Sequence, residues 1–169
     1  METITIKKAT IDDAIDIADI HMLSWEVAYK DIIPTEYIIE KNKTRPAQWQ
    51  NLLLKNDCEY FIIQLENNTI GFITLAKPQD KNSDENYYEL VSLYLHPDYC
   101  RKGFGTVALN YISSYTKALG EKYLILFVLE DNHSARLFYE KNGFLFDGTK
   151  KTLNYGKPLS ALRYRRELA

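Results

Sequence analysis

Cysteine, histidine and long apolar runs are scarce in this sequence, and each shortage excludes a class of protein. Its 169 residues include two cysteines, Cys58 and Cys100, and three histidines, and none of them has the spacing of metal ligands. We therefore expect no zinc site and no disulfide framework, but two free thiols in a reducing cytoplasm. No apolar run approaches the roughly 20 residues of a membrane span and no signal-peptide segment is recognisable, so no membrane association is expected.

An excess of basic charge is absent as well. The formal net charge is −2, and the cations are not clustered as a nucleic-acid-binding face requires, so no nucleic-acid partner is expected. Hydrophobic residues make up 46% and charged residues 26% of the chain, which is ordinary for a globular protein. A chain of this length suits one core, and residues 1–169 are predicted to form a single domain.

Apolar periodicity and turn residues predict a mixed α/β chain. Strands are expected near residues 3–8, 58–66, 70–77, 87–96, 123–129, 144–149 and 159–167, and helices near 10–29, from Pro34, over Arg45–Lys55, and near 103–119 and 132–142. A tight turn at Asn67-Asn68 should join the second and third strands. The resulting order, β-α-α-α-β-β-β-α-β-α-β-β, indicates one central sheet with helices around it.

The segment Arg101-Lys102-Gly103-Phe104-Gly105 follows the fourth strand and opens a long helix. Glycines let the backbone approach a phosphate closely, and the free N–H groups and dipole of a helix N-terminus favour anions. The two cations add positive charge at the same turn. This pattern predicts a site for a cofactor that carries a pyrophosphate.

The same glycines formally match a dinucleotide-binding fingerprint, Gly103-x-Gly105-x-x-Ala108, with Glu130 about 25 residues further on. However, the fingerprint glycine normally follows its strand at once, whereas six residues from Pro97 to Lys102 intervene here. Only about 40 residues remain after Glu130, too few for the rest of a doubly wound sheet. A nicotinamide- or flavin-binding fold is therefore disfavoured.

Four motifs together resemble the GCN5-related N-acetyltransferase (GNAT) superfamily. They stand in the family's order and spacing over nearly the whole chain: Ser24-Trp25 with Tyr29, Leu93-Tyr94-Leu95-His96-Pro97, Arg101-Lys102-Gly103-Phe104-Gly105-Thr106, and Asn132-x-x-Ala135-Arg136-x-Phe138-Tyr139-x-x-x-Gly143-Phe144. No single motif is decisive, but their combination is specific. The sequence departs from the pattern at Cys100, where the family usually has glutamine or arginine, and this should weaken cofactor binding modestly.

The resemblance implies a single-domain α/β fold, in which a mixed, mostly antiparallel sheet is splayed at its middle strands and flanked by helices. It also implies acetyl-CoA as co-substrate, no metal, and direct attack by a primary amine of a small molecule or peptide. The cofactor-binding residues that it indicates are Leu93, Tyr94, Leu95, Arg101, Lys102, Gly103, Phe104, Gly105, Thr106, Asn132 and Ser134. For the strand residues Leu93, Tyr94 and Leu95, the structural alternative is simple core packing. Asn132 can cap a helix and also contact the cofactor, so these two roles are compatible.

Two further positions match residues that the family uses for proton transfer. An alkylamine with a pKa near 10.4 must lose a proton, at a cost of roughly 4–5 kcal/mol at neutral pH, and Glu89 is the expected base, directly or through water. Tyr139 is the expected acid for the leaving thiolate, because phenol and thiol pKa values lie close together. The structural alternative for Glu89 is a strand residue that faces solvent, and for Tyr139 it is a tyrosine of the core.

The acceptor is the part that the sequence determines least. By the resemblance, Trp25 and Tyr29 on the first helix lie on the acceptor side, where aromatic rings suit a cationic amine, although their helical spacing also suits a core. The alternative function is a catalytically silent CoA-binding sensor or interaction module; Glu89 and Tyr139 argue against it and Cys100 favours it slightly. The acceptor's identity and the oligomeric state stay open, a homodimer included.

Overall fold

The computed structural model describes residues 2–79 and 86–169, which form one α/β domain around a seven-stranded sheet. The strands are β1 (Ile4–Lys8), β2 (Glu59–Leu65), β3 (Asn68–Ala76), β4 (Tyr87–Leu95), β5 (Tyr123–Leu129), β6 (Leu145–Asn154) and β7 (Pro158–Glu167). The helices are η1 (Ile11–Asp13), α1 (Ala14–Ala28), α2 (Thr35–Lys55), η2 (Pro97–Tyr99), α3 (Phe104–Ala118) and α4 (His133–Lys141). The sheet order is β1-β2-β3-β4-β5-β7-β6, and only β4 and β5 pair in parallel. The predicted mixed, mostly antiparallel sheet is confirmed.

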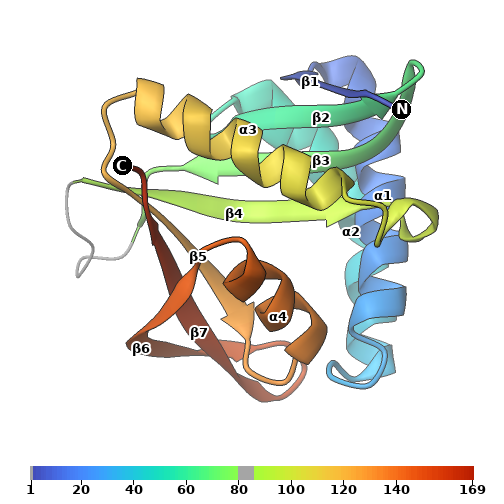
Figure 1. The fold of residues 1–169 in the computed structure, drawn as a ribbon. Coiled ribbons are helices and arrows are strands. Elements are labelled where there is room, and N and C mark those ends of the chain that lie inside the picture. Colours follow the sequence, from blue (N-terminus) through green and yellow to red (C-terminus); the bar gives the residue numbers. More distant parts are fainter. Residues whose placement is uncertain (1, 80–85) are drawn as a thin grey trace.

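Helices cover both faces of the sheet (Figure 1). Helix α3 crosses one face of β1–β4, α1 and α2 lie against the other face, and α4 lies beside β5 and β7. Side chains of β2 therefore alternate between two cores: Phe61 packs in the cluster that includes α3, and Ile62 in the cluster that includes α1 and α2. Burial on both faces explains why this strand is apolar almost throughout.

One long helix, α2, replaces the two short helices expected from Pro34 and over Arg45–Lys55. It runs unbroken through Pro46, although an internal proline lacks the N–H of a helical hydrogen bond. Ile38, Arg45 and Trp49 are its buried residues, at spacings of one helical face. Their burial stabilises one continuous helix and outweighs the helix-breaking preference of Pro46. Among the described residues, no helix is long and apolar enough to cross a bilayer.

Two strand boundaries also differ from the expectation. The turn between β2 and β3 consists of Glu66 and Asn67, both with positive φ (49° and 67°), one residue before the expected Asn67-Asn68. Paired positive φ values are typical of the type I′ turn, whose twist matches a hairpin. Strand β6 continues to Asn154 rather than ending at 149, because a bulge between Phe146 and Lys150 lets it stay paired with β7.

An irregularity in β4 shapes the centre of the sheet. Its register against β3 passes from Thr74 opposite Ser92 to Leu75 opposite Leu90, so Val91 is an extra residue. Leu90 and Leu93 both pack into the core under α3, although residues three apart on a regular strand face opposite sides. The bulge therefore reverses the alternation of side chains between the two halves of β4.

Strands β4 and β5 separate shortly after the start of their pairing. They are paired only from Tyr87 opposite Tyr123 to Glu89 opposite Ile125, and then diverge (Figure 1). Strand β5 continues alongside β7 as far as Leu129. The second half of β4 thus has one edge that pairs with no described strand, and the predicted splay of the middle strands is confirmed.

A neutral histidine lies in the core between α1, α2 and the sheet. His21 Nδ1 accepts a hydrogen bond from Trp49 Nε1 at 3.0 Å, and its ring stacks on Tyr94 with centroids 5.3 Å apart. Burial, followed by the charge of Arg45, lowers the pKa of His21 from 6.5 to about 3. Because the folded protein resists protonation at this site, the stabilisation is complete above pH 6.5 and is lost as the pH falls below that value.

This linkage predicts a measurable loss of stability in mild acid. Between pH 6.5 and pH 5 the free energy of unfolding of the wild type should fall by about 2 kcal/mol more than that of His21→Gln. Glutamine keeps an acceptor for Trp49 but does not titrate. Urea unfolding at the two pH values measures the difference, and parallel losses in both proteins would show that His21 is not responsible.

Candidate active site

A cavity of about 230 Å³ opens where β4 and β5 separate. Its lining includes Glu89 and Tyr94 from β4 and Trp25 and Tyr29 from α1. Glu89 and Tyr94 are five residues apart and would face opposite sides of a regular strand, but the bulge at Val91 places them on the same face. The structure therefore brings together one predicted proton acceptor and both predicted acceptor-side aromatic residues.

Hydrogen bonds tie the aromatic side chains of this cavity to one another. Trp25 Nε1 donates to the Tyr94 hydroxyl at 3.2 Å, and the Tyr29 and Tyr94 hydroxyls lie 3.3 Å apart. Burial raises the pKa of Tyr29 well above its usual value. The Tyr29 hydroxyl is therefore neutral at physiological pH and can donate or accept a hydrogen bond without adding charge.

Tyr139 lies beside this group but does not line the cavity. It belongs to α4, and its ring packs on Phe138 and Phe144 with centroid distances of 5.2 and 5.8 Å. Burial raises the pKa of Tyr139 above its usual range, and the neighbouring Tyr94 adds to the effect. Its hydroxyl therefore remains protonated at neutral pH.

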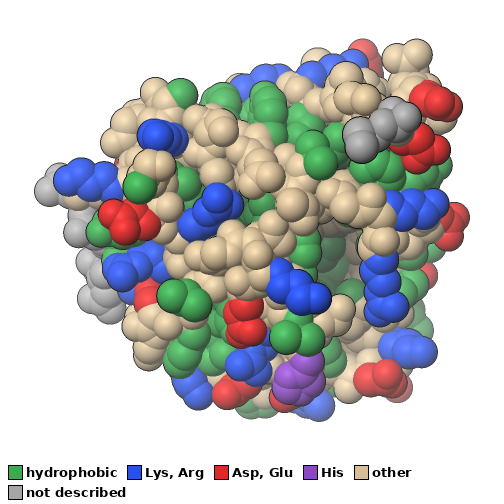
Figure 2. All heavy atoms as spheres, viewed as in Figure 1, with side chains coloured by type: hydrophobic (Ala, Val, Ile, Leu, Met, Phe, Trp, Pro, Cys, Tyr) green, Lys and Arg blue, Asp and Glu red, His purple; other side chains and the backbone are tan. Residues whose placement is uncertain are grey.

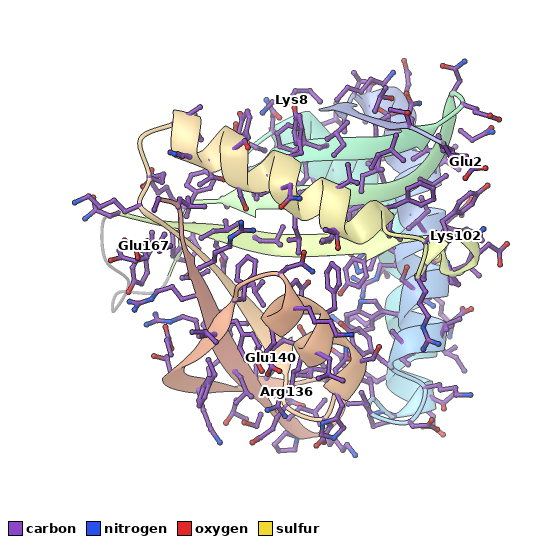
Figure 3. The ribbon with its side chains drawn as sticks, in the orientation of Figure 1. Glu2, Lys8, Lys102, Arg136, Glu140 and Glu167 are labelled. Carbon is purple, nitrogen blue, oxygen red and sulfur yellow. The ribbon has the colours of Figure 1, made fainter. Side chains whose placement is uncertain are left out.

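The N-terminal end of α3 lies at the far end of β4, next to the turn that carries the two cations. Gly103 is its N-cap, with a left-handed φ of +87° and no side-chain cap, so the first N–H groups of the helix are not occupied by a capping side chain. Arg101, Lys102 and Thr106 are exposed, and Figure 3 shows Lys102 beside this end of α3. In Figure 2 the surface is hollowed between α3 and α4, with Lys and Arg side chains beside the hollow. The Phe104 side chain is buried in the core, so this residue offers a ligand only its backbone.

The second glycine of the motif serves packing between helices. A Cβ atom on Gly105 would lie 2.9 Å from Cζ of Phe138, whereas one on Gly103 would meet nothing within 4 Å. Gly105 therefore has a packing role, and the expected approach of a phosphate to both glycines stays a prediction. The missing side chain of Gly105 lets α3 approach α4, while its N–H stays in the first turn of the helix.

The predicted strand residues Leu93, Tyr94 and Leu95 are half-buried. Leu93 and Leu95 pack on the core under α3, and Tyr94 on the two cores of the other face. The edge of this segment that pairs with no described strand faces the split, and of the three residues only Tyr94 lines the cavity. The Leu95 carbonyl already accepts a hydrogen bond from Ser24 Oγ at 3.1 Å, which fastens α1 to the end of β4.

Cys100 replaces a long polar side chain of the family pattern with a short thiol. Its Sγ contacts the carbonyl oxygens of His96 and Leu95 at 3.7 and 3.9 Å. Burial raises the pKa of this thiol, only partly offset by Arg101. The thiol is therefore neutral and directed back to the end of β4, and it adds no charge to the glycine turn.

The motif at the start of α4 has a clear structural role. Asn132 Oδ1 accepts a hydrogen bond from the Ala135 N–H at 3.2 Å, so the predicted helix cap is confirmed, and Ser134 is exposed beside it. Arg136 donates through Nε to the Tyr164 hydroxyl at 3.0 Å and through Nη1 to the Glu130 carbonyl at 2.9 Å. Arg136, labelled in Figure 3, thus holds α4 against β7.

The sequence reasoning missed the residues that β5 and β6 contribute to the cavity. Lys151, Leu153 and Tyr155 follow one another at alternate positions, and Phe127 completes this wall. The period of two is a signal that could have found them, but the strand was expected to end at residue 149. They reach the cavity only because the bulged β6 continues as far as Asn154.

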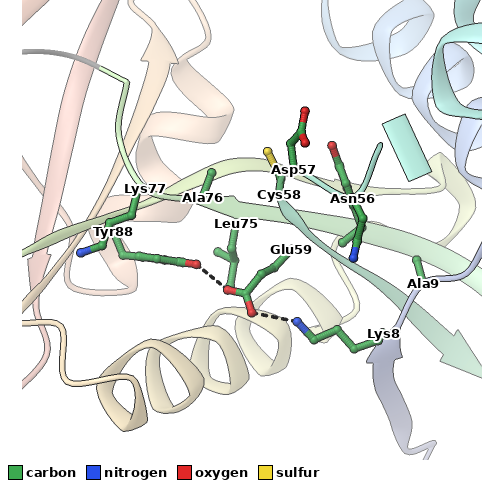
Figure 4. Close-up of a pocket in the computed structure, with 11 residues that line it drawn as sticks. Lys8, Ala9, Asn56, Asp57, Cys58, Glu59, Leu75, Ala76, Lys77 and Tyr88 are labelled. Atoms are coloured by element: carbon green, nitrogen blue, oxygen red, sulfur yellow. Dashed lines mark hydrogen bonds and ion pairs between the residues drawn. The ribbon is translucent and has the colours of Figure 1, made fainter. Parts of the chain in front are cut away.

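A second cavity, of about 560 Å³, lies at the other end of the sheet between β1, β2, β3 and β4 (Figure 4). Its central carboxylate, Glu59, forms an ion pair with Lys8 at 2.8 Å and accepts hydrogen bonds from the hydroxyls of Tyr88, at 2.5 Å, and Tyr115. These partners lower the pKa of Glu59. Because its charge is satisfied and it lies away from the split, this cavity is the weaker candidate.

The chain matches the model of the acetyltransferase (GNAT) family over residues 17–144. It is 29% identical over 140 residues to the uncharacterised N-acetyltransferase YuaI of Bacillus subtilis, a match that covers 81% of this chain and 78% of the relative. It is also 29% identical over 153 residues to the spermidine N(1)-acetyltransferase of Thermoplasma acidophilum, with 87% of this chain and 91% of that protein covered.

Solved structures share the fold over nearly the full length. The PaiA N-acetyltransferase from Thermoplasma acidophilum, in complex with coenzyme A, superimposes with a TM-score of 0.79 and 25% identity, covering 98% of this chain and 99% of that chain. YncA from Salmonella typhimurium, solved with its cofactor acetyl-CoA, is alike in fold alone, with a TM-score of 0.71 and 15% identity over 99% of this chain and 95% of that chain. The range matched by the family model contains the bulged β4, the glycine turn and Tyr139. This chain belongs to the acetyltransferase (GNAT) family.

Proposed function

We propose that this protein transfers the acetyl group of acetyl-CoA to a primary amine of a small molecule or peptide, by direct attack in a ternary complex. The observation that carries the proposal is the position of Glu89, in the cavity where β4 and β5 part, while an uncapped helix N-terminus with two cations lies at the other end of the same strand. The activities named for the relatives in the family support it.

The residues present fit coenzyme A. The left-handed Gly103 and the free first turn of α3 suit a pyrophosphate, and the unpaired edge of β4 suits the amide groups of pantetheine. We assign binding to the backbone edge of Leu93, Tyr94 and Leu95, to Arg101, Lys102, Gly103, Phe104, Gly105 and Thr106 at the turn, and to Asn132 and Ser134 at α4. When bound, acetyl-CoA supplies an acetyl group as a thioester, which exchanges its C–S bond for a C–N bond to the amine.

Glu89 acts on the acceptor. An alkylammonium with a pKa near 10.4 cannot attack, and its deprotonation at pH 7 costs roughly 4–5 kcal/mol. The half-buried carboxylate of Glu89 removes this proton, directly or through a water molecule, so that the nitrogen lone pair is available. The aromatic rings of Trp25 and Tyr29 line the same cavity and hold the ammonium before it is deprotonated.

Tyr139 acts on the leaving group. Breaking the thioester leaves a thiolate, and the protonated hydroxyl of Tyr139 donates a proton to the sulfur, so that the products are the acetylated amine and a free thiol. When the C–N bond forms, the nitrogen loses a second proton, which reaches Tyr139 through solvent and replaces the one given to the sulfur. The first proton, held at Glu89, is released to solvent, so both groups are restored and one proton is released per turnover. We further propose that one domain, residues 1–169, carries out this reaction in the cytoplasm, as its two free thiols suggest.

A thiol-release assay tests the proposal. The full chain is incubated with acetyl-CoA and separate panels of amino acids, polyamines, aminoglycosides and peptides with free N-termini, and free CoA is measured over time. We expect release above the rate of spontaneous hydrolysis with at least one class of amine, together with mass spectrometric detection of the acetylated product. Tight binding of CoA without turnover on any amine would instead support the sensor function.

A further inference from the structure

The acceptor cavity contains two opposite charges. Among its lining residues, Glu89 is the carboxylate and Lys151 the ammonium, and the others are aromatic or aliphatic. Burial raises the pKa values of Tyr29 and Tyr155, so these tyrosines stay neutral. The cavity thus offers one negative and one positive group, where a site for a polyamine would need several negative groups.

Lys151 lies at the wall of this cavity, and no described residue is its counter-ion. Its Nζ lies 3.7 Å from the centroid of the Phe127 ring, a cation–π contact between β6 and β5. None of the ion pairs among the described residues involves it, whereas the preceding Lys150 pairs with Glu130 at 3.2 Å. The ammonium of Lys151 is therefore positioned and available for an anion.

A second cation lies behind the aromatic wall. Arg45 is 5% exposed, its guanidinium stands 4.6 Å from the ring centroid of Trp25, and its Nη1 donates to Gln48 at 3.0 Å. No ion pair among the described residues neutralises Arg45, and its buried Nε has no hydrogen-bond partner. Its charge adds positive potential to the cavity behind Trp25.

The carboxylates near the cavity do not make the net charge around it negative. Glu130, directly after β5, is paired with Lys150, and Asp147 on β6 is paired with Arg163 at 2.6 Å. Away from Glu89, this end of the sheet therefore brings to the cavity two cations, Lys151 and Arg45, that no described carboxylate neutralises. A ligand with two or more ammonium groups would place its second cation against that charge.

We propose that the acceptor is a small amine that also carries an anionic group, such as a carboxylate or a phosphonate, with its ammonium at Glu89 and its anion at Lys151. This inference rests on the proposed function and specifies its substrate class. The cavity volume of about 230 Å³ lies below the roughly 300–1,000 Å³ typical of ligand pockets, so the acceptor is compact. Lys151 is thus a specificity-determining residue.

A matched series of acceptors tests the charge at the distal end. 4-Aminobutyrate, 4-aminobutyramide and 1,4-diaminobutane carry the same primary amine and differ in a distal charge of −1, 0 or +1. We expect kcat/KM to fall in this order, with at least a tenfold difference between the acid and the diamine. 3-Aminopropylphosphonate, a second anionic probe, should be accepted at least as well as the amide.

Variants of the two neighbouring lysines separate a specific contact from general charge. Lys151→Gln should lower kcat/KM for 4-aminobutyrate at least tenfold, mostly through KM, and lower that for the amide at least threefold less. Lys151→Glu should shift the preference toward the diamine. Lys150→Gln is the control for the loss of one positive charge, because the Lys150 side chain pairs with Glu130 and does not line the cavity. Calorimetric titration of 4-aminobutyrate in the presence of CoA gives a readout independent of turnover.

The outcomes distinguish the two proposals. Transfer to the diamine in preference to the acid, or an acid preference that survives in Lys151→Gln, overturns the anionic acceptor and leaves the transferase proposal intact. Absence of transfer to every amine of this series and of the wider panels overturns the proposed function, and the acceptor assignment falls with it. A preference for the acid that Lys151→Gln abolishes supports both.

Discussion

Replacement of Glu89 by glutamine is expected to lower kcat at pH 7 by about 100- to 1,000-fold, the usual contribution of a general base. Glutamine keeps the size and the hydrogen bonding of the side chain but cannot accept the proton of an ammonium. Glu89 lies on β4 beside the point where the strands part, far along the strand from the glycine turn, so the affinity for acetyl-CoA should change less than twofold. Initial rates and a direct binding titration measure the two quantities.

The pH dependence of Glu89→Gln tests the role of Glu89 as a base more directly than the rate at a single pH. A free amine with a pKa near 10.4 deprotonates by itself as the pH rises, so the base becomes less necessary. The ratio of wild-type to Glu89→Gln kcat/KM should therefore shrink steadily between pH 7 and pH 10. Glu167→Gln, at an exposed position on β7, is the matched control. A ratio that stays constant over this range would indicate that Glu89 has a structural role only.

Replacement of Tyr139 by phenylalanine is expected to lower kcat by about 100-fold, because the leaving thiolate then lacks its proton donor. The hydroxyl has a raised pKa and remains protonated at neutral pH, so the wild type holds this proton when the reaction begins. Phenylalanine retains the ring and its contacts with Phe138 and Phe144, and the melting temperature should stay within a few degrees. Steady-state rates and the affinity for acetyl-CoA, which should hardly change, check the prediction.

Two further measurements separate proton donation from packing at this position. Tyr111→Phe removes the hydroxyl of an exposed tyrosine on α3 and should have no effect on kcat. An acetyl thioester of a more acidic thiol should restore part of the rate of Tyr139→Phe, because its leaving group needs less assistance. An unchanged rate in Tyr139→Phe, or equal losses with both thioesters, would remove Tyr139 as the acid.

Local signals were sufficient for most of the elements. The apolar run Tyr123–Leu129 is a central strand, Asn132 caps α4, and the glycine turn opens α3, all as their residues predict. Each of these features depends on contacts within a few residues or on a period that the chain carries by itself. The predicted boundaries of elements were wrong where packing between distant parts of the chain determined them. One example is α2, which continues through Pro46.

Motifs within the chain were enough to indicate the family, the mixed sheet with its splayed middle, and the segment with free N–H groups and cations. Three features became visible only in the folded molecule: Gly105 makes room for Phe138, Glu89 and Tyr94 share one face, and Lys151 reaches the same cavity. The physical reason is that a single bulge at Val91 reverses the alternation of β4, and that β6 comes to Phe127 through pairing with β7. Contacts of that kind join residues far apart in the chain, and no local pattern records them.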